Sequence, residues 1–377
     1  MKAVGIICEY NPFHNGHLAL IEGARRAFPD KKIFCFISGE FVQRGDVALF
    51  PAYERAKAAV LCGADAVFEL PTAFCLSPAQ IYAKSAVRLI ASMGICDVLV
   101  FGSESGDKDA LVTASKRLYG KELEESLAPL LKDKPYPEAR ELAYRSLYGD
   151  DGFPSTPNDI LSVEYIKALE DTDMDFLPIK RSSGDRIVSA TAIRAMVKDG
   201  RETSEYLPDK AAEVFKTAMA EGKMRREEGF ERAFLSAIVL AEGYFADVPK
   251  DFLPKIKECA RHSRSLTEYY ERLSVKHYTS ARLRRMSLCT ALGITKDEWD
   301  EPAPYARLLA LKTSAGANIK GSKIPVLSKS ADVRAISDEA ADYFEKEARR
   351  ALFAYNAQEN TLSLADVYRS TPFIVKE

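Results

Sequence analysis

The sequence predicts an α/β fold in which a Rossmann-like parallel sheet is followed by a mostly helical C-terminal domain. Two observations support this prediction. Over the first 105 residues, short apolar runs alternate with stretches of helical spacing, which is typical of parallel strands joined by crossover helices. Beyond about residue 205 this alternation stops, and helical periodicity dominates to about residue 295 before shorter mixed elements follow.

Short apolar runs, several of them bounded by Gly or Pro, indicate the individual strands, and amphipathic stretches between them indicate helices. We expect strands at residues 4–8, 32–38, 65–70, 97–101 and 174–180. We expect helices at residues 18–26, 53–62, 78–91 and 158–170, with a further helix that begins at Ser189.

The same patterns suggest how the chain divides into domains. Residues 1–205 are expected to form one nucleotide-binding domain, with a charged helical insertion at 107–157. Residues 206–377 are expected to form a second, mostly helical and basic domain. A chain of 377 residues is long enough for two or three domains.

Composition describes an ordinary folded protein, with 47% hydrophobic and 29% charged residues. No apolar run approaches the ~20 residues that cross a bilayer. The seven cysteines contain no C-x-x-C pair and stand mostly within apolar runs, which predicts reduced core thiols. Since Met1 and Lys2 lead directly into a strand, no signal peptide is expected, and we expect a cytoplasmic protein without membrane contact.

Charge is distributed unevenly, although the net charge is only −2. Residues 254–290 carry nine Lys and Arg against three Asp and Glu, and residues 307–331 carry five against none. Four tyrosines accompany these basic stretches, Tyr269, Tyr270, Tyr278 and Tyr305. The pattern is compatible with RNA binding and equally with a solvated protein face.

The most informative segment is His14-Asn15-Gly16-His17, which lies between the first predicted strand and the helix that follows it. In an open α/β sheet this position is the carboxyl edge of the strands, where ligands bind. A helix start there supplies free N–H groups and partial positive charge, which suit phosphate. A metal pair is the weaker interpretation, because no third ligand stands nearby at metal-binding spacing.

A second segment, Ser189-Ala190-Thr191 with Arg194, complements the first. Ser189 is a good helix N-cap, and Thr191 supplies another hydroxyl at the same helix end. Arg194 adds a permanent positive charge, so this segment is suited to the β- and γ-phosphates of a nucleoside triphosphate. The two segments together predict an ATP site in which His14, His17 and Arg194 act on the phosphates.

These residues carry a family resemblance. The pairing of H-x-G-H with S-x-T-x-I-R resembles the nucleotidylyltransferase superfamily, and the longer motifs resemble the bacterial tRNA(Met) cytidine acetate ligases. The matching segments are Glu9-Tyr10-Asn11-Pro12-Phe13-His14-Asn15-Gly16-His17, residues 38–45, 63–71 and 101–104, Pro157-Asn158-Asp159-Ile160-Leu161, residues 278–285 and residues 304–307.

The resemblance implies a two-step reaction. Acetate attacks the α-phosphate of ATP to give acetyl-adenylate and pyrophosphate, and the wobble cytidine of elongator tRNA(Met) then takes the acetyl group on N4. It implies ATP contacts at Ile7, Cys8, Glu9, Tyr10, Asn11, Pro12, Phe13, Asn15, Gly16, Leu18, Ala19, Leu20, Gly102, Asn158, Arg181 and Ser182, beside Ser189 and Thr191. Mg²⁺ is expected to arrive with the ATP phosphates, since no dedicated metal ligands are visible.

Contacts to RNA are expected at Gln43, Arg44, Lys276, Tyr278, Arg282 and Arg285. Several of the site residues also have plain structural interpretations: Asn158 as a helix N-cap, Cys8 as strand core, and Gln43 with Arg44 as a solvent turn. Two other functions remain open at this point, a nucleotidylyltransferase that adenylylates a small metabolite and a catalytically degenerate RNA-binding protein. The oligomeric state is also open.

Overall fold

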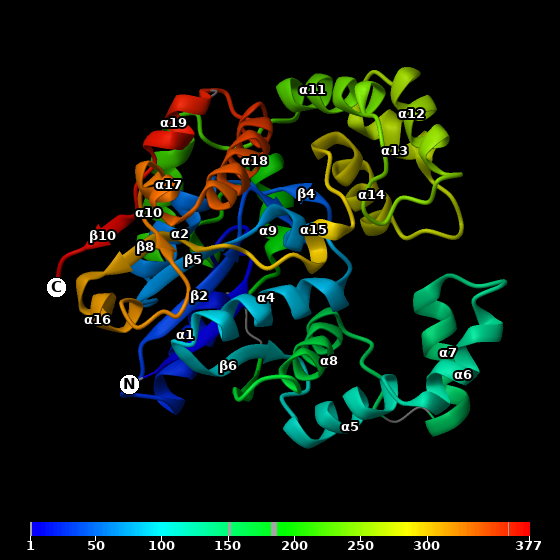
Figure 1. Cartoon of the computed structure of the whole chain (residues 1–377), viewed down its shortest axis with the longest axis horizontal. Helices are drawn as coiled ribbons and strands as arrows, with labels where there is room; N and C mark the ends of the chain where they lie inside the picture. Colours follow the sequence, from blue (N-terminus) through cyan, green and yellow to red (C-terminus); the bar gives the residue numbers. More distant parts are fainter. Residues whose placement is uncertain (1, 150–151, 182–186, 361) are drawn as a thin grey trace.

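The computed structural model of the chain describes residues 2–149, 152–181, 187–360 and 362–377. Its centre is a sheet with the strand order β10-β8-β5-β2-β1-β6-β7, and β9 pairs with β8 (Figure 1). The strands of this sheet are β1 (Ala3–Cys8), β2 (Ile33–Ser38), β5 (Ala66–Leu70), β6 (Cys96–Ser103), β7 (Asp175–Lys180), β8 (Ala306–Lys312), β9 (Val326–Leu327) and β10 (Phe373–Val375).

The five strands expected from the sequence are confirmed, and all pair in parallel, β5-β2-β1-β6-β7. The order reverses between β1 and β6, because the chain moves outward in one direction from β1 through β2 to β5 and then returns to β6 on the other side. This switch point leaves a crevice at the carboxyl ends of β1 and β6, where ligands bind in folds of this kind.

Alternate side chains along each strand enter two separate cores. Along β2, Phe34 and Phe36 belong to the core beneath α4 (Ala79–Met93) and α8 (Pro157–Leu169), and Ile33, Cys35 and Ile37 belong to the core beneath the helices of the other face. Those are α1 (Asn15–Ala27), α2 (Ala52–Leu61) and α10 (Asp209–Ala220). Helices therefore cover both faces, which explains why the central strands consist mostly of apolar residues.

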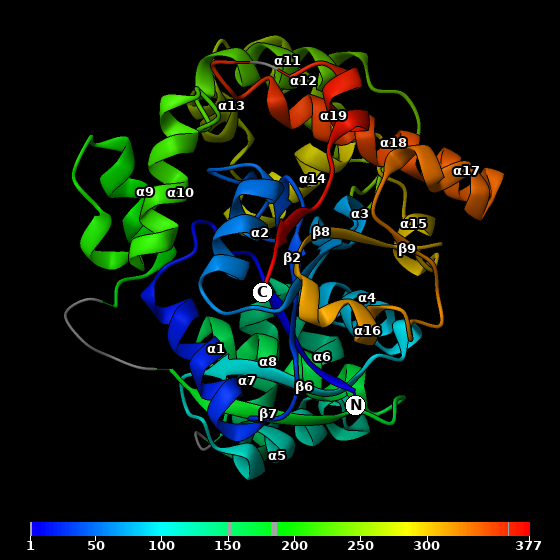
Figure 2. The ribbon, with the colours of Figure 1, turned by 90° about the vertical axis from the view of Figure 1, so that its left-hand side faces the viewer.

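The expected helical insertion consists of α5 (Lys108–Leu118), α6 (Lys121–Leu130) and α7 (Tyr136–Tyr148), which extend the α4–α8 face of the sheet (Figure 2). Leu111, Ala114 and Leu118 of α5 pack into the same core as Val163 and Ile166 of α8. The insertion is thereby attached to the sheet through α8.

The second half of the chain is mostly helical, as expected. Helices α11 to α14 contribute most of one core, which includes Phe234, Tyr269 and Met286 and also takes in Phe41 and Val47 of the first half of the chain; a further core surrounds Phe344. The helices after β7 are α9 (Ala190–Lys198), α10, α11 (Glu227–Leu240), α12 (Leu253–Arg261), α13 (Leu266–Leu273), α14 (Ser280–Leu292), α15 (Asp297–Asp300), α16 (Gly316–Ile319), α17 (Val333–Ile336), α18 (Asp338–Tyr355) and α19 (Leu364–Arg369).

Three strands of the second half were not expected, and they join the central sheet. β8 pairs antiparallel with β5, and β9 and β10 pair parallel with β8. The polypeptide after residue 205 therefore completes the sheet as well as forming helices. The expected boundary between two domains at residue 205 stays a prediction. Arg307 at the start of β8 forms a partly buried ion pair with Glu69 at 3.0 Å, so this part of the 307–331 basic stretch is structural.

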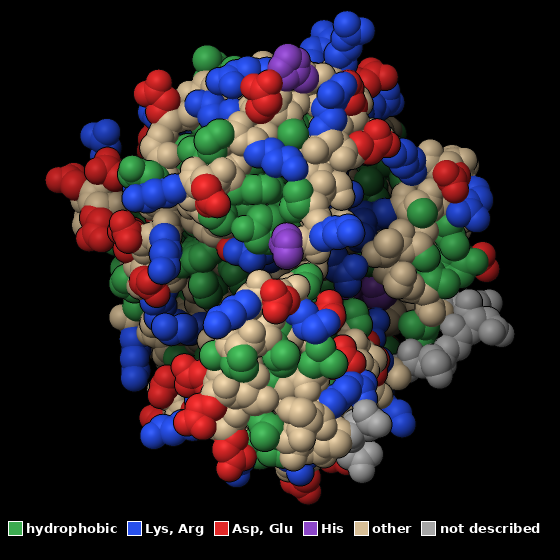
Figure 3. Space-filling view, turned by 90° about the vertical axis from the view of Figure 1, so that its right-hand side faces the viewer, with side chains coloured by type: hydrophobic (Ala, Val, Ile, Leu, Met, Phe, Trp, Pro, Cys, Tyr) green, Lys and Arg blue, Asp and Glu red, His purple; other side chains and the backbone are tan. Residues whose placement is uncertain are grey.

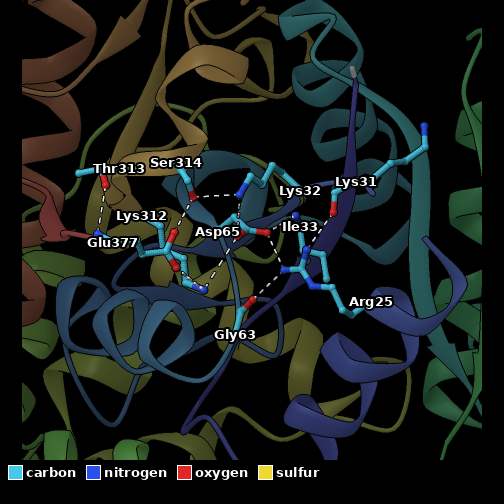
Figure 4. A network of polar contacts seen from close by, with 10 residues as sticks. All are labelled: Arg25, Lys31, Lys32, Ile33, Gly63, Asp65, Lys312, Thr313, Ser314 and Glu377. Carbon is cyan, nitrogen blue, oxygen red and sulfur yellow. Dashed lines mark hydrogen bonds and ion pairs between the residues drawn. The ribbon is translucent and has the colours of Figure 1, made fainter. Parts of the chain in front are cut away.

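A buried carboxylate at the opposite edge of the sheet joins the two halves of the chain (Figure 4). Asp65 receives hydrogen bonds from the Arg25 guanidinium at 2.6 Å and from the N–H of Ile33 at 2.8 Å. Lys32 and Lys312 lie 3.8 and 4.0 Å from its other oxygen, and Lys312 also pairs with Glu377. The carboxyl terminus is thus attached to the amino ends of β2 and β5.

All seven cysteines are free thiols, as expected from their spacing. Within the described residues, no helix is long and apolar enough to span a membrane.

Candidate active site

A cavity of about 470 Å³ lies at the carboxyl ends of the parallel strands, within the size range of small-ligand sites. Its lining comes from the ends of β1, β6 and β7, the start of α1, the turn after β3 (Phe41–Val42), and α8 and α9. These segments lie far apart in the sequence and meet at the switch point. In the space-filling view, Lys and Arg side chains gather along a hollow between the upper and lower parts of the molecule (Figure 3).

His14 and His17 lie together at the start of α1. The N–H of Gly16 donates to Nδ1 of His14 at 3.0 Å, and the N–H of His14 donates to Nδ1 of His17 at 3.2 Å. The two rings stack with centroids 3.7 Å apart. Because both Nδ1 atoms accept hydrogen bonds, each neutral imidazole carries its proton on Nε2 and presents an N–H donor there.

Both imidazoles are kept neutral. Burial, together with the charges of Arg181 and Arg194, lowers the pKa of His14 to about 4. Burial and the neighbouring His14 ring lower the pKa of His17 well below its ordinary value. Both rings line the cavity, so they suit hydrogen bonding to developing negative charge without carrying a charge of their own.

The turn that carries the histidines is tightly built. Tyr10 adopts a left-handed backbone with φ of 51°, and its ring packs edge-on against Phe13 and His17. At Gly16 an added Cβ would stand 2.9 Å from Cε1 of His14. A glycine is therefore needed here for close packing of the His14 ring.

The start of α9 faces the same cavity. Ser189 caps the helix by accepting from the N–H of Ala192 at 3.2 Å. The Arg194 guanidinium donates to the hydroxyl of Thr191 at 3.1 Å and to the carbonyl of Asn11 at 2.7 Å. Arg194 therefore connects the two segments that the sequence pairs, and Ser189, Thr191 and Arg194 all line the cavity.

The far wall is built from β6, β7 and α8. Gly102, Asn158 and Arg181 line the cavity there, as the resemblance implies. The amide of Asn158 donates to Glu104, which also accepts from Thr156 and lies 3.8 Å from Arg181. The alternative interpretation of Asn158 as an N-cap is wrong, because Thr156 occupies that position and Asn158 is the second residue of α8.

Not every residue of the 7–20 segment reaches the cavity. Those that line it are Ile7, Cys8, Glu9, His14, Gly16, His17, Ala19 and Leu20. Tyr10 and Phe13 are buried in the core, Asn11 accepts from the N–H of Leu49, and Asn15 donates to the carbonyl of Glu205. Pro12 and Leu18 are also absent from the lining, so these six residues shape the turn around the cavity. Ser182 lies outside the described residues.

Sequence reasoning missed several lining residues. Apolar walls come from Tyr82, Phe101, Leu161 and Tyr165, and further charges come from Arg26, Lys180 and Glu104. Glu104 and Phe101 stand in a motif that the resemblance quotes, and that signal was available. The tyrosines of α4 and α8 stand in ordinary helical patterns, and only the packing of the helices on the sheet brings them here.

The residues expected to contact RNA lie in two places. Gln43 and Arg44 line the cavity from the turn of a small hairpin of β3 and β4 (Asp46–Val47), and Arg44 is exposed, so the solvent-turn and the RNA-contact interpretations both stay predictions. The Arg285 guanidinium is buried and donates to the carbonyl of Gln43, and Gly45 packs directly on α14. Arg282 is held by Asp247 at 2.7 Å and stacks on Tyr278, whereas Lys276 is exposed.

Some of the tyrosines that accompany the basic stretches have structural roles. Tyr269 and Tyr305 are buried, so the expectation that they accompany an RNA surface is wrong for these two. A second cavity of about 460 Å³ lies behind the hairpin. It is lined by the cations Lys198, Arg225 and Arg284 and by the same number of carboxylates, Asp46, Glu227 and Glu271. The residues with catalytic potential lie in the first cavity.

Within the described part of the chain, no group of three or more His, Cys, Asp or Glu side chains could hold a metal ion. Two carboxylates that the described residues place on the cavity wall, Glu9 and Glu104, both accept hydrogen bonds from the protein.

Comparison with known proteins agrees with this geometry. The family model of the HIGH nucleotidyl transferases matches residues 1–365. The parallel sheet, the stacked histidines at its switch point and the facing arginine thus define a nucleotidyl transferase of the HIGH type.

Individual relatives identify a more specific family within this class. A tRNA(Met) cytidine acetate ligase of Listeria monocytogenes is 32% identical over 352 residues, 87% of each chain. A second, from Caldanaerobacter subterraneus, is 31% identical and covers 89% of this chain and 90% of the relative. The structure of Thermotoga maritima TmcAL bound with alpha-thio ATP matches with a TM-score of 0.89 and 26% identity, over 100% of both chains. The chain belongs to the tRNA(Met) cytidine acetate ligase family.

Proposed function

We propose that this protein activates acetate with ATP and transfers the acetyl group to N4 of the wobble cytidine of elongator tRNA(Met), releasing pyrophosphate and AMP. Family membership supports the overall reaction. The solved relative with an ATP analogue supports ATP as the activating substrate.

The observation that carries the proposal is the cavity in which His14, His17 and Arg194 face one space. When the acetate oxygen attacks the α-phosphorus, negative charge develops on the phosphate oxygens and on the leaving pyrophosphate. Two fixed N–H donors and one guanidinium are suited to that charge, and they need no rearrangement during the reaction. Ser189 and Thr191 add hydroxyl donors at the start of α9, where the helix dipole favours phosphate.

In this proposal the first step needs no proton transfer, since acetate attacks as an anion and pyrophosphate leaves as one. Mg²⁺ would enter with the ATP phosphates and neutralise part of their charge. RNA would approach along the hairpin that carries Gln43 and Arg44, with Lys276 and the surface of α14 beside it.

The proposal is tested by incubating the protein with ATP and unmodified tRNA, with and without acetate, and analysing the RNA nucleosides by mass spectrometry. We expect N4-acetylcytidine only when all three substrates are present, and AMP in equal amount. Turnover of ATP that ignores acetate and RNA would instead support a nucleotidylyltransferase acting on a small metabolite. RNA binding without turnover would support a degenerate binding protein.

A further inference from the structure

Among the described residues, the cavity wall includes the carboxylate of Glu9, which stands in the segment expected to contact ATP. Glu9 follows β1 directly, and one of its oxygens accepts from the N–H of Gln43 at 2.8 Å. Among the described residues, the walls of the cavity also carry the cations Arg26, Arg44, Lys180, Arg181 and Arg194. A carboxylate beside a triphosphate opposes its binding electrostatically, so the position of Glu9 indicates a different task.

The second half-reaction has a requirement that the first lacks. As the cytidine amine attacks the acetyl carbon, a C–N bond forms and the bond from that carbon to the AMP oxygen breaks. The amine nitrogen must also release one proton before the amide is complete. General base catalysis by a side chain serves this purpose, with typical contributions of about 10²- to 10⁴-fold.

The histidines are poorly suited to accept that proton. Hydrogen bonds from Gly16 and His14 backbone N–H groups occupy the Nδ1 atoms, so the Nε2 atoms already carry protons. The lowered pKa of both rings further opposes a second proton. Glu104, a second carboxylate on the described part of the wall, accepts from Asn158 and Thr156 and lies beside Arg181.

Glu9, by contrast, is joined to the hairpin on which RNA contacts are expected. Gln43 supplies the N–H that holds its carboxylate, and Arg44 follows Gln43 at the cavity wall. We propose, on the basis of the proposed function, that Glu9 accepts the proton of the cytidine N4 amine during acetyl transfer. The Glu9 carboxylate then becomes a carboxylic acid, and AMP leaves with the oxygen of the broken bond.

The electrostatics of the position agree with this role. Burial raises the pKa of Glu9, which makes the carboxylate a stronger base, although the hydrogen bond from Gln43 and nearby guanidinium groups oppose the shift. The groups that surround Glu9 are Arg44, Arg55, Arg194, Cys75, Tyr82 and Tyr165. Burial raises the pKa of Cys75 to about 12 and that of both tyrosines above their ordinary value, so this thiol and the two phenols stay neutral near pH 7.

Glu9→Gln tests the proposal, because the glutamine oxygen can still accept from Gln43 but the side chain takes up no proton. The first half-reaction is measured as acetate-dependent exchange of pyrophosphate into ATP without RNA. The second is measured as a single turnover of synthetic acetyl-adenylate with tRNA, followed through N4-acetylcytidine. We expect transfer to fall about 10²- to 10⁴-fold, and by a larger factor than exchange.

The pH profile of transfer supplies a second readout. In the wild type the transfer rate should rise with pH to a plateau as Glu9 loses its proton, and in Glu9→Gln it should be low and independent of pH. Glu104→Gln is the matched comparison, and it should lower exchange more than transfer, since Glu104 holds Asn158.

Several outcomes overturn the proposal. Transfer by Glu9→Gln within tenfold of wild type excludes a base at this position. Equal loss of rate in both half-reactions, or a lowered melting temperature that accounts for the loss, would mean that Glu9 only stabilises the hairpin. If the wild type forms acetyl-adenylate but never acetylates cytidine, the proposed function itself fails, and this result is separate from the behaviour of the variant.

Discussion

At the scale of single residues, the two histidines show how local geometry decides chemistry. Each ring accepts a backbone hydrogen bond within its own turn, and that bond fixes which nitrogen carries the proton. The motif alone predicts the location of these residues, because strand, glycine and helix start are all local. It does not predict their tautomers or their low pKa, which depend on burial and on Arg181 and Arg194.

Loss of either imidazole should slow the activation of acetate. We expect His14→Ala and His17→Ala each to lower pyrophosphate exchange by about 10²- to 10³-fold, the usual loss for one donor to developing charge. Since His14 is also the N-cap of α1, His14→Asn is the control: asparagine retains the cap but removes the ring. If His14→Asn regains wild-type exchange, His14 acts only through the helix.

The rate of exchange should not follow an ordinary histidine titration. With the pKa of His14 at about 4, the ring stays neutral as the pH falls from 8 to about 5. We therefore expect no inflection near pH 6.5 in exchange, measured at saturating ATP and acetate. NMR of ¹⁵N-histidine in the protein should show both rings neutral with the proton on Nε2. A protonated ring for His14 at pH 6 would contradict this description of the site.

At the scale of elements, the sequence predicts the five parallel strands and most helices well, because buried parallel strands are short apolar runs between amphipathic helices. It misses β8, whose partner β5 lies about 240 residues earlier, and that pairing is not encoded locally. It also misses the cavity walls on α4 and α8, because Tyr82 and Tyr165 are recognisable as site residues only after the helices pack on the sheet.

Glu40 is a buried link between elements and gives a stability prediction. Its carboxylate accepts from the N–H of Ala52 at the start of α2 and from the hydroxyl of Tyr355 at the end of α18. Burial raises its pKa to about 7, so folding favours the protonated form. The stability that this proton contributes is present below pH 4.5 and is lost as the pH rises through about 7.

The free energy of unfolding of Glu40→Gln relative to wild type should therefore be higher at pH 8 than at pH 5 by about 1–3 kcal/mol. The reason is that the glutamine keeps an acceptor and carries no charge at either pH. Denaturant unfolding of both proteins at the two pH values measures this difference. Wild type and variant with the same pH dependence of unfolding would show that Glu40 is ionised in the folded protein.

At the scale of the whole molecule, cations from separate segments of the chain, among them Arg44, Arg181 and Arg194, meet at the crevice. Of the predicted RNA contacts, Gln43 and Arg44 lie on the cavity wall, and Arg282 and Arg285 are engaged by the protein. Composition shows that the second half is basic, but it does not distinguish a cation held in an ion pair, such as Arg307, from an exposed one such as Lys276.

RNA affinity should fall with salt, and Lys276 should contribute to that dependence. We expect Lys276→Gln to reduce the slope of log affinity against log salt by about 0.7–0.9, the value for one lost phosphate contact. Lys320→Gln, at an exposed position after α16 on the opposite side of the fold, is the control and should leave the slope unchanged (Figure 1). Equal slopes for wild type and Lys276→Gln would remove Lys276 from the RNA surface.

The central claim is that acetate attacks the α-phosphate of ATP in the cavity between α1 and α9 before the acetyl group reaches RNA. Acetate labelled with ¹⁸O in both oxygens tests it most directly, with AMP analysed by mass spectrometry after complete turnover with tRNA. The account predicts one ¹⁸O in each AMP and one in each N4-acetylcytidine. Unlabelled AMP alongside N4-acetylcytidine would contradict it, because acetyl-adenylate would then not lie on the path.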